Sequence, residues 1–263
     1  MGFLTELVAD RRAALAARPL DEDALRASAE DAPAARPLGW LLRGAAVADG
    51  VALIAEVKRA SPSAGDIAVD ADPVLQATAY DVAGATAISV LTEPTRFRGS
   101  LDDLRAVRAV VQHPVLRKDF LVHPSELLEA RAAGADSVLL ITAALPGEEL
   151  ERMLAASRKL GMEPLVETHS DEDLARVLAT DASIVGVNAR DLESLAVDPE
   201  VARARLAAIP EDRVRVLESG IRDRRDVVSA VEAGASAILV GEMLMRARDP
   251  GAAIAALLGW EVA

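Results

Sequence analysis

Charged side chains stand directly at the end of an apolar run in the segment PVLRKDF, residues 114–120. The run begins as a buried strand and then passes into Arg117, Lys118 and Asp119 before Phe120. Because strand side chains alternate between two faces, Lys118 shares the face of the apolar residue two positions earlier. A lysine at the end of a buried strand is a compact, titratable proton donor, which an arginine is not. The segment therefore predicts acid–base chemistry.

Four further apolar runs end in the same way. Their ends carry Glu56 with Lys58, Glu167, Asn188 with Arg190, and Glu218 followed by Ser219 and Gly220. Of the 29 basic residues only three are lysines, so a lysine kept at such a position is informative. A structural network of ion pairs explains any one of these residues equally well. Gathering five such ends in one place is costly unless function requires it, so together they predict a catalytic site.

Glycine-containing segments follow the last two predicted strands: ESGI contains Gly220, and VGEML contains Gly241. Each segment is expected to open a helix, whose free backbone N–H groups bind phosphate. Glu242 would take part through its backbone, because its carboxylate repels an anion. The loop KRASPSAG places Ser61 near a lysine and fits the same anion pocket. An ordinary turn is the alternative for each segment.

A repeated unit positions these ends. The segments GATAISVLT, GADSVLLIT, DASIVGVN and GASAILVG each pair a short turn with an apolar run. Glycine after an amphipathic stretch is typical of a helix C-cap, so the unit is helix, turn and buried strand. Eight strands are predicted at 51–57, 86–92, 114–118, 137–142, 163–167, 184–188, 214–218 and 237–241. Helices are predicted at 73–83, 100–111, 124–133, 147–160, 171–179, 198–208, 223–233 and 249–258.

Buried strands that alternate with helices predict a parallel sheet. Eight such units in roughly 250 residues fit an α/β fold, the (β/α)8 TIM barrel, whose active site lies at the C-terminal strand ends. An open doubly wound sheet is the alternative, but no GxGxxG motif follows the first strand.

Residues 1–48 precede the barrel. Phe3, Leu4 and Leu7 have helical spacing, so this segment is expected to form extra helices packed on the barrel, within one domain of residues 1–263.

The composition narrows the class of partner. The chain of 263 residues has a net charge of −13, which argues against non-specific binding to nucleic acid or to an anionic membrane. A local cluster of basic residues can still bind an anionic small molecule. No segment approaches the ~20 apolar residues of a membrane span. The chain has no cysteine, which suits a cytoplasmic protein. A monomer is expected.

Neither a metal ion nor an organic cofactor is expected. The three histidines, His113, His123 and His169, lack the spacing of a metal-binding motif. Glu167, His169 and Asp171 resemble a carboxylate–histidine cluster. The acidic run that begins at Asp171 is better explained as a helix start that the helix dipole favours.

These features together resemble the indole-3-glycerol-phosphate synthase family. The resemblance runs from about residue 50 to residue 258, and the preceding segment is compatible with the family's N-terminal helices. The matching motifs are IAEVKRASPSAG (54–65), SVLTEPTRFRGS (89–100), PVLRKDF (114–120), EARAAGADSVLLI (129–141), LVETH (165–169), GVNARDL (186–192), ESGI (218–221) and LVGEMLM (239–245). The resemblance implies a carbon–carbon lyase of tryptophan biosynthesis that needs no cofactor.

The family's reaction closes an indole ring. Its substrate, 1-(2-carboxyphenylamino)-1-deoxyribulose 5-phosphate, condenses its aromatic ring onto its own ketone. It then loses carbon dioxide and water to give indole-3-glycerol phosphate. This chemistry needs an acid at the ketone, a group for the carboxylate, and an acid and a base for dehydration.

By resemblance, Lys118 is the acid at the ketone and Glu167 is the acid–base partner. Lys58 binds the carboxylate or the phosphate, and which lysine gives the second proton stays open. Glu56 and Glu218 belong to the supporting charges. The remaining expected contacts are Asn188 and Arg190 for the substrate, Ser61, Ser219, Gly220, Gly241 and Glu242 at the phosphate end, and Phe97, Phe120 and Leu139 in the aromatic pocket.

Three positions depart from the family's usual residues. Ser125 and Glu126 stand where Tyr-Gln is frequent, and Ala189 stands where a second asparagine is frequent. These changes bear on rate and affinity rather than on the reaction.

Two other functions stay open: a regulatory barrel without catalysis, and another phosphate-binding barrel such as phosphoribosylanthranilate isomerase. Release of indole product and carbon dioxide distinguishes them.

Overall fold

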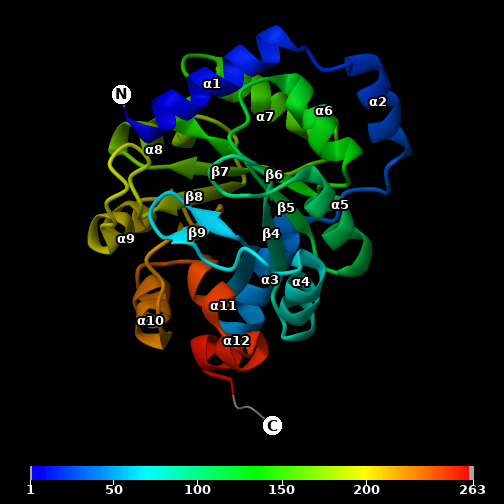
Figure 1. Cartoon of the computed structure of the whole chain (residues 1–263). Coiled ribbons are helices and arrows are strands. Elements are labelled where there is room, and N and C mark those ends of the chain that lie inside the picture. Colours follow the sequence, from blue (N-terminus) through cyan, green and yellow to red (C-terminus); the bar gives the residue numbers. More distant parts are fainter. Residues whose placement is uncertain (1, 261–263) are drawn as a thin grey trace.

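Eight apolar runs pair side by side in parallel and close into a barrel in the computed structural model, which describes residues 2–260 (Figure 1). Around the barrel the order is β1, β10, β9, β8, β7, β6, β5 and β4. The strands are β1 (Ala52–Val57), β4 (Ala87–Leu91), β5 (Val115–Lys118), β6 (Ser137–Ile141), β7 (Leu165–Thr168), β8 (Ile184–Asn188), β9 (Val214–Glu218) and β10 (Ala237–Val240). The predicted (β/α)8 TIM barrel is confirmed.

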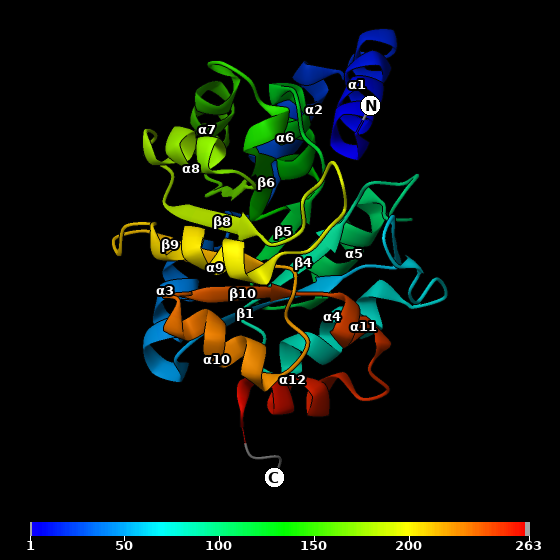
Figure 2. The same cartoon turned by 90° about the vertical axis from the view of Figure 1, so that its left-hand side faces the viewer.

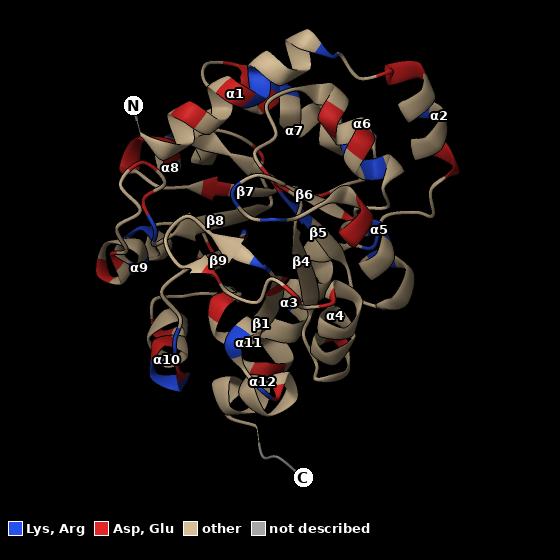
Figure 3. Ribbon diagram, in the orientation of Figure 1, with Lys and Arg blue, Asp and Glu red and all other residues tan. Residues whose placement is uncertain are grey.

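Helices cover the outside of the barrel and follow the predicted pattern. They are α4 (Pro73–Val82), α5 (Leu101–Val110), α6 (Pro124–Ala132), α7 (Glu149–Lys159), α8 (Asp171–Leu178), α9 (Pro199–Ala207), α10 (Arg224–Glu232) and α12 (Pro250–Leu258). The short helix α11 (Glu242–Arg246) and the 3-10 helix η1 (Thr142–Ala144) are additional. Acidic and basic positions are interspersed over outer helices such as α6 and α10 (Figure 3). Among residues 2–260, none of the helices has the length and apolar character to cross a membrane.

Strand residues alternate between two hydrophobic cores. Leu53 of β1 packs in the core between strands and helices, whereas its neighbour Ile54 packs in the barrel interior. Leu116 of β5 also faces the interior. Because the side-chain period of a strand is two, Lys118 follows Leu116 to the inside, where it lines a cavity. The predicted orientation of Lys118 is therefore confirmed.

Three helices precede the barrel: α1 (Phe3–Ala17), α2 (Glu22–Asp31) and α3 (Leu38–Asp49). Figure 2 shows α3 at the end of the barrel where the strands begin and α1 beside the opposite end. Leu38 and Leu42 of α3 are fully buried in the inner core, and Leu4 of α1 joins the same core. Helix α2 packs against α6. The predicted N-terminal helices are confirmed.

Two loops differ from the prediction. Gly220 does not open a helix, because α10 begins at Arg224 and Asp223 caps it. An aspartate is a stronger N-cap than most residues and fixes the helix start three positions later. The loop after β1 contains a short hairpin of β2 (Ala60–Ser61) and β3 (Gly65–Asp66). Gly241, in contrast, is the N-cap of α11, as predicted.

Candidate active site

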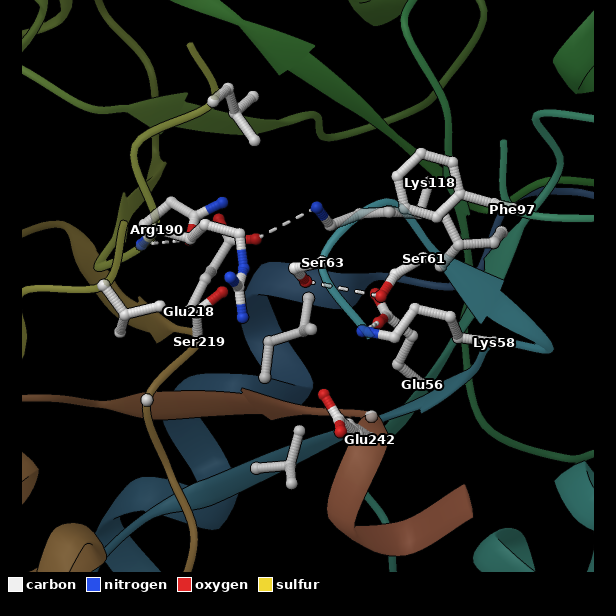
Figure 4. Close-up of a pocket in the computed structure, with 18 of the residues that line it drawn as sticks. Glu56, Lys58, Ser61, Ser63, Phe97, Lys118, Arg190, Glu218, Ser219 and Glu242 are labelled. Atoms are coloured by element: carbon white, nitrogen blue, oxygen red, sulfur yellow. Dashed lines mark hydrogen bonds and ion pairs between the residues drawn. The ribbon is translucent and has the colours of Figure 1, made fainter. Parts of the chain in front are cut away.

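A cavity of about 800 Å³ opens where the barrel strands end (Figure 4). The structure brings every residue predicted for the site into its lining. These are Glu56, Lys58, Ser61, Phe97, Lys118, Phe120, Leu139, Glu167, Asn188, Arg190, Glu218, Ser219, Gly220, Gly241 and Glu242. Charged groups from β1, β5, β7 and β9 therefore share one space, as the strand-end pattern predicts.

Lys118 projects from β5 between two buried carboxylates. Its Nζ donates a hydrogen bond to Oε2 of Glu167 at 3.0 Å and lies 3.3 Å from Oε2 of Glu218. The side chains of both glutamates are 1% exposed. Three ionisable groups thus lie in contact and are largely shielded from water. The charge state of each therefore depends on the other two.

Burial and mutual charge set the protonation of this group. Burial alone would lower the pKa of Lys118, but the neighbouring carboxylates, Glu167 first, raise it above its ordinary value. Burial also opposes ionisation of Glu167, yet Lys118 holds the pKa of that carboxyl well below its usual range. Burial and the Glu167 anion raise the pKa of Glu218 well above the ordinary value. The arrangement therefore favours a charged Lys118 and an ionised Glu167, and it opposes ionisation of Glu218.

A second lysine–carboxylate pair lies on the opposite wall. The Nζ of Lys58 is 2.8 Å from Oε1 of Glu56, whose Oε2 faces the Ser89 hydroxyl at 3.5 Å. Glu56 is buried, whereas the side chain of Lys58 is 19% exposed and reaches the cavity (Figure 4). The ammonium group of Lys58 is therefore held by Glu56 and still reaches the cavity.

Two glycines make room for the buried carboxylates. A Cβ atom on Gly186 of β8 would collide with Oε1 of Glu218 and approach Leu165 at 3.2 Å. A Cβ atom on Gly241 would lie 2.6 Å from Oε1 of Glu56. Close approach of a neighbouring group thus requires glycine at both positions.

Aromatic rings form another wall. Phe97 and Phe120 have ring centroids 5.8 Å apart, and Phe3 of α1 meets Phe120 edge-on at 6.2 Å. All three line the cavity together with Leu139. The chain has three phenylalanines, so all of them gather here. An apolar slot beside Lys118 suits a benzene ring.

Asn188 is the last residue of β8, and Arg190 follows two positions later; both line the cavity. The Asn188 side-chain oxygen accepts the N–H of Arg190 at 3.0 Å, and Nη1 of Arg190 donates to the carbonyl of Leu195 at 2.9 Å. Arg190 makes no ion pair with another group in residues 2–260. Its guanidinium is therefore oriented and still available to an anionic group.

Backbone donors gather at another part of the wall. Ser219 and Gly220 adopt consecutive left-handed conformations, with φ of 64° and 78°. Within residues 2–260, the N–H groups of Ser219, Gly220 and Gly241 donate no hydrogen bond to protein. Ser61 adds a hydroxyl that accepts the Ala64 N–H at 3.2 Å. Free N–H groups that line a cavity are suited to a phosphate.

Of the other charges of PVLRKDF, Arg117 lies outside the cavity lining as predicted, whereas Asp119 is part of it. Arg117 is 1% exposed; its guanidinium bonds Asp119 at 2.9 Å and Glu129 of α6 at 2.9 Å. Arg11 of α1 approaches Asp119 at 3.5 Å. Although burial opposes it, Arg117 and Arg11 hold the pKa of Asp119 below its usual range. Lys118 therefore belongs to the cluster with Glu167 and Glu218, whereas Arg117 and Asp119 form a separate group of ion pairs at the edge of the cavity.

The departures from the family's usual residues lie around the cavity. Oε1 of Glu126 pairs with Arg11 at 2.6 Å, and its Oε2 accepts the N–H of His123 at 3.0 Å. Ser125 is buried and bonds the His123 ring. The N–H of Ala189 donates to the Glu218 carbonyl at 2.8 Å. As predicted, these residues support the site rather than line it.

Sequence reasoning missed residues that arrive from distant segments. Phe3 belongs to the N-terminal extension, and the rarity of phenylalanine was the one signal for it. Ser63 and Arg222 also line the cavity. His169, in contrast, was grouped with Glu167 from the sequence, and its Nε2 lies 3.1 Å from Oε1 of that residue. Across residues 2–260, no group of three or more His, Cys, Asp or Glu side chains is placed to hold a metal ion.

The family model for indole-3-glycerol phosphate synthase matches residues 4–257. The chain belongs to the indole-3-glycerol phosphate synthase family. The indole-3-glycerol phosphate synthase of Mycolicibacterium vanbaalenii is 48% identical over 257 residues, which cover 97% of this chain and 93% of that protein. That of Kineococcus radiotolerans is 50% identical over 262 residues, or 98% and 95% of the two chains. The resemblance that the motifs predict is confirmed.

Solved structures share the barrel at low identity. Tryptophan synthase subunit alpha from Legionella pneumophila matches with a TM-score of 0.59 and 16% identity, over 84% of this chain and 97% of that one. Thiamine phosphate pyrophosphorylase from Pyrococcus furiosus matches with a TM-score of 0.60 and 17% identity, over 80% and 95%. These likenesses show the fold, whereas membership of the indole-3-glycerol phosphate synthase family rests on the sequence matches.

Proposed function

We propose that this chain is a decarboxylating lyase that forms indole-3-glycerol phosphate from 1-(2-carboxyphenylamino)-1-deoxyribulose 5-phosphate in tryptophan biosynthesis. Its family membership supports the reaction. One observation supports the assignment of the chemistry to this cavity. Lys118 lies beside an apolar slot for a benzene ring and within 3.0 Å and 3.3 Å of two glutamates whose pKa values are shifted in opposite directions.

The substrate has three parts that match three walls. Its benzene ring fits between Phe97 and Phe120, beside Leu139. Its phosphate takes the free N–H groups of Gly220 and Gly241, with the hydroxyls of Ser61 and Ser219 and the backbone of Glu242. Its carboxylate meets Lys58 and Arg190, and Asn188 holds Arg190 in place. This orientation puts the ketone at Lys118, which lies between the aromatic and phosphate ends.

Ring closure forms one carbon–carbon bond. The ring carbon that bears the carboxylate attacks the ketone carbon, and the ketone oxygen takes a proton from Lys118. The raised pKa of Lys118 means that it enters this step charged, as a proton donor must. Its hydrogen bond to Glu167 then gives a route by which a proton can return to it.

Decarboxylation and dehydration complete the indole. The bond to the carboxylate breaks, carbon dioxide leaves, and the electron pair restores the aromatic ring. The new hydroxyl then leaves as water with a proton from a lysine, Lys58 or Lys118. The adjacent carbon gives its proton to the ionised Glu167, and the double bond of the indole forms. Glu56 and Glu218 keep the two lysines in position.

Turnover by the purified protein tests this proposal. Indole fluorescence should appear when the carboxyphenylamino substrate is added, with one carbon dioxide released for each product formed. A barrel that had lost catalysis would bind the substrate without fluorescence. An isomerase such as phosphoribosylanthranilate isomerase would release no carbon dioxide. Either result would contradict the proposal.

The proposal includes the setting of the enzyme. The partner is a small phosphorylated substrate rather than nucleic acid or a membrane, in keeping with the net charge of −13. We place the enzyme in the cytoplasm, which its lack of cysteine suits, and take it to be a monomer. Light scattering on the purified protein tests the monomer: a dimer mass at assay concentration would contradict it.

A further inference from the structure

The two oxygens of Glu167 have different surroundings. Oε2 accepts the hydrogen bond from Lys118, whereas Oε1 lies 3.1 Å from Nε2 of His169. Oε1 and Nε2 are both buried, and neither has a regular hydrogen bond in residues 2–260. Their separation of 3.1 Å is nevertheless within the range of a hydrogen bond. Because a buried polar atom without a partner is costly, each is the natural partner of the other.

The backbone of His169 is fixed from two sides. It follows β7, its N–H donates to Oδ2 of Asp173 in α8 at 3.2 Å, and its carbonyl accepts from Nη1 of Arg205 in α9 at 2.5 Å. The side chain is 7% exposed and lies outside the cavity lining. His169 therefore touches Glu167 and not the space for the substrate.

We propose that His169 is a positioning residue: its Nε2–H holds Oε1 of Glu167, so that Oε2 stays directed at Lys118 and the carboxylate stays ionised. This inference rests on the proposed role of Glu167 as the base. Without the imidazole, Oε1 would be buried with no donor. The carboxylate would then turn or take up a proton, and either change removes the base. Lys118 lowers the pKa of Glu167, and His169 lowers it further.

Three variants test the inference through kcat and KM. His169→Leu removes the donor and keeps an apolar side chain of similar bulk. It should lower kcat by about 10- to 100-fold, the loss typical of residues that orient a functional group at metal sites. KM should change less, because the substrate contacts remain. His169→Gln restores an N–H near the position of Nε2 and should recover most of the lost kcat.

His113→Leu is the matched control. His113 also faces a carboxylate, with Nδ1 2.7 Å from Oδ1 of Asp81, but it precedes β5 at the far end of the barrel. This variant should keep parental kcat. A His169→Leu variant within twofold of the parent would overturn the inference. So would a His169→Gln variant as slow as His169→Leu, because the donor would then not matter.

Nitrogen-15 NMR of the imidazole rings tests the contact without any turnover. The chain has three histidines, so the spectrum is simple. At neutral pH the His169 ring should carry a proton on Nε2, and Glu167→Gln should shift its signals and leave those of His113 and His123 in place. An unprotonated Nε2, or no response to Glu167→Gln, would overturn the inference even if His169→Leu fails to fold. A parent protein that makes no indole would instead count against the proposed function, and the NMR result would still stand.

Discussion

Lys118 is a lysine in a chain whose basic residues are mostly arginine, and its chemical role accounts for this choice. Twenty-nine basic residues include three lysines, and two of these line the cavity. Lys118 contacts Glu167, whose pKa is lowered, and Glu218, whose pKa is raised, so the charges of the three groups depend on one another. An arginine stays charged and takes no part in proton transfer. The residue type therefore follows from the chemistry rather than from ion pairing.

Lys118→Arg separates proton donation from charge. General acid catalysis is typically worth ~10²–10⁴-fold. We expect Lys118→Arg to fold and to lose at least ~10²-fold in kcat, because the guanidinium cannot give up its proton. Substrate affinity should change less, since the phosphate and aromatic contacts remain. Steady-state indole formation, with circular dichroism as the folding control, measures this. A folded variant within tenfold of parental kcat would show that Lys118 is not the essential acid.

We expect Glu218→Gln to lower kcat and to raise the free energy of unfolding. Because burial and Glu167 raise its pKa, Glu218 keeps its proton in the folded state after the unfolded chain has lost it. Its contribution to stability is therefore full below the ordinary carboxyl pKa and is lost as pH rises from there towards the raised pKa. A glutamine has no proton to lose. The variant should gain on the order of 1 kcal/mol over the parent at pH 8, and much less at acid pH.

Thermal unfolding of both proteins across pH 5 to 8 measures the effect. The difference in Tm, variant minus parent, should grow with pH, while kcat falls. A difference that shrinks as pH rises would mean that Glu218 is ionised in the folded state.

At the scale of elements, the barrel strands and outer helices were predictable because both have strong periodicity. The strands are buried on both faces, and glycines end the preceding helices. The hairpin of β2 and β3 was not predictable, because it is held by a turn at Gly65 rather than by an apolar pattern. The same holds for the site. Residues on strand ends, such as Lys118 and Glu167, follow from alternation, whereas Phe3 reaches the site through tertiary packing.

Gly186→Ala tests how β8 makes room for β9. The added Cβ would meet Oε1 of Glu218 and displace a carboxylate that lies beside Lys118. A misplacement of about 1 Å can cost on the order of 10²-fold in rate, and we expect a loss of that order in kcat. Gly44→Ala in α3 is the control, since nothing lies within 4 Å of its Cβ. It should keep parental activity and gain roughly 0.5–1 kcal/mol of stability. Equal activity of both variants would refute the steric argument.

Helix α1 contributes an aromatic ring to the site. Phe3 meets Phe120 edge-on, and such aromatic contacts are worth about 0.5–1.5 kcal/mol. Phe3→Ala should therefore raise KM by roughly 3- to 10-fold. The acids and bases are untouched, so kcat should stay near the parental value. Initial rates over a range of substrate concentration separate the two constants. A fall in kcat at unchanged KM would show that α1 acts on chemistry rather than on binding.

At the scale of the molecule, the acidic balance and the anionic substrate are compatible because the charges are placed differently. The net charge of −13 belongs to the whole chain, and acidic and basic positions are interspersed over its outer helices (Figure 3). Inside the cavity, Lys58 and Arg190 offer cations, and the glycine loops offer free N–H groups. The raised pKa of Glu218 opposes a further negative charge in the same space. Local arrangement, which net composition does not reveal, thus decides what the cavity accepts.

The N-terminal extension and the barrel should unfold as one domain. Arg11 of α1 pairs with buried Glu126, and the N–H of Arg36 donates to buried Asp136 at 2.8 Å. Leu38 and Leu42 of α3 fill the end of the inner core, so opening α3 would expose the barrel interior. Native-state hydrogen exchange should therefore show α3 amides opening with the barrel strands at the free energy of global unfolding. The terminal turns of α1 should exchange sooner, as helix ends do. If α3 lost protection at low denaturant while β1 and β9 kept theirs, residues 1–48 would be a separable unit and the single domain would be refuted.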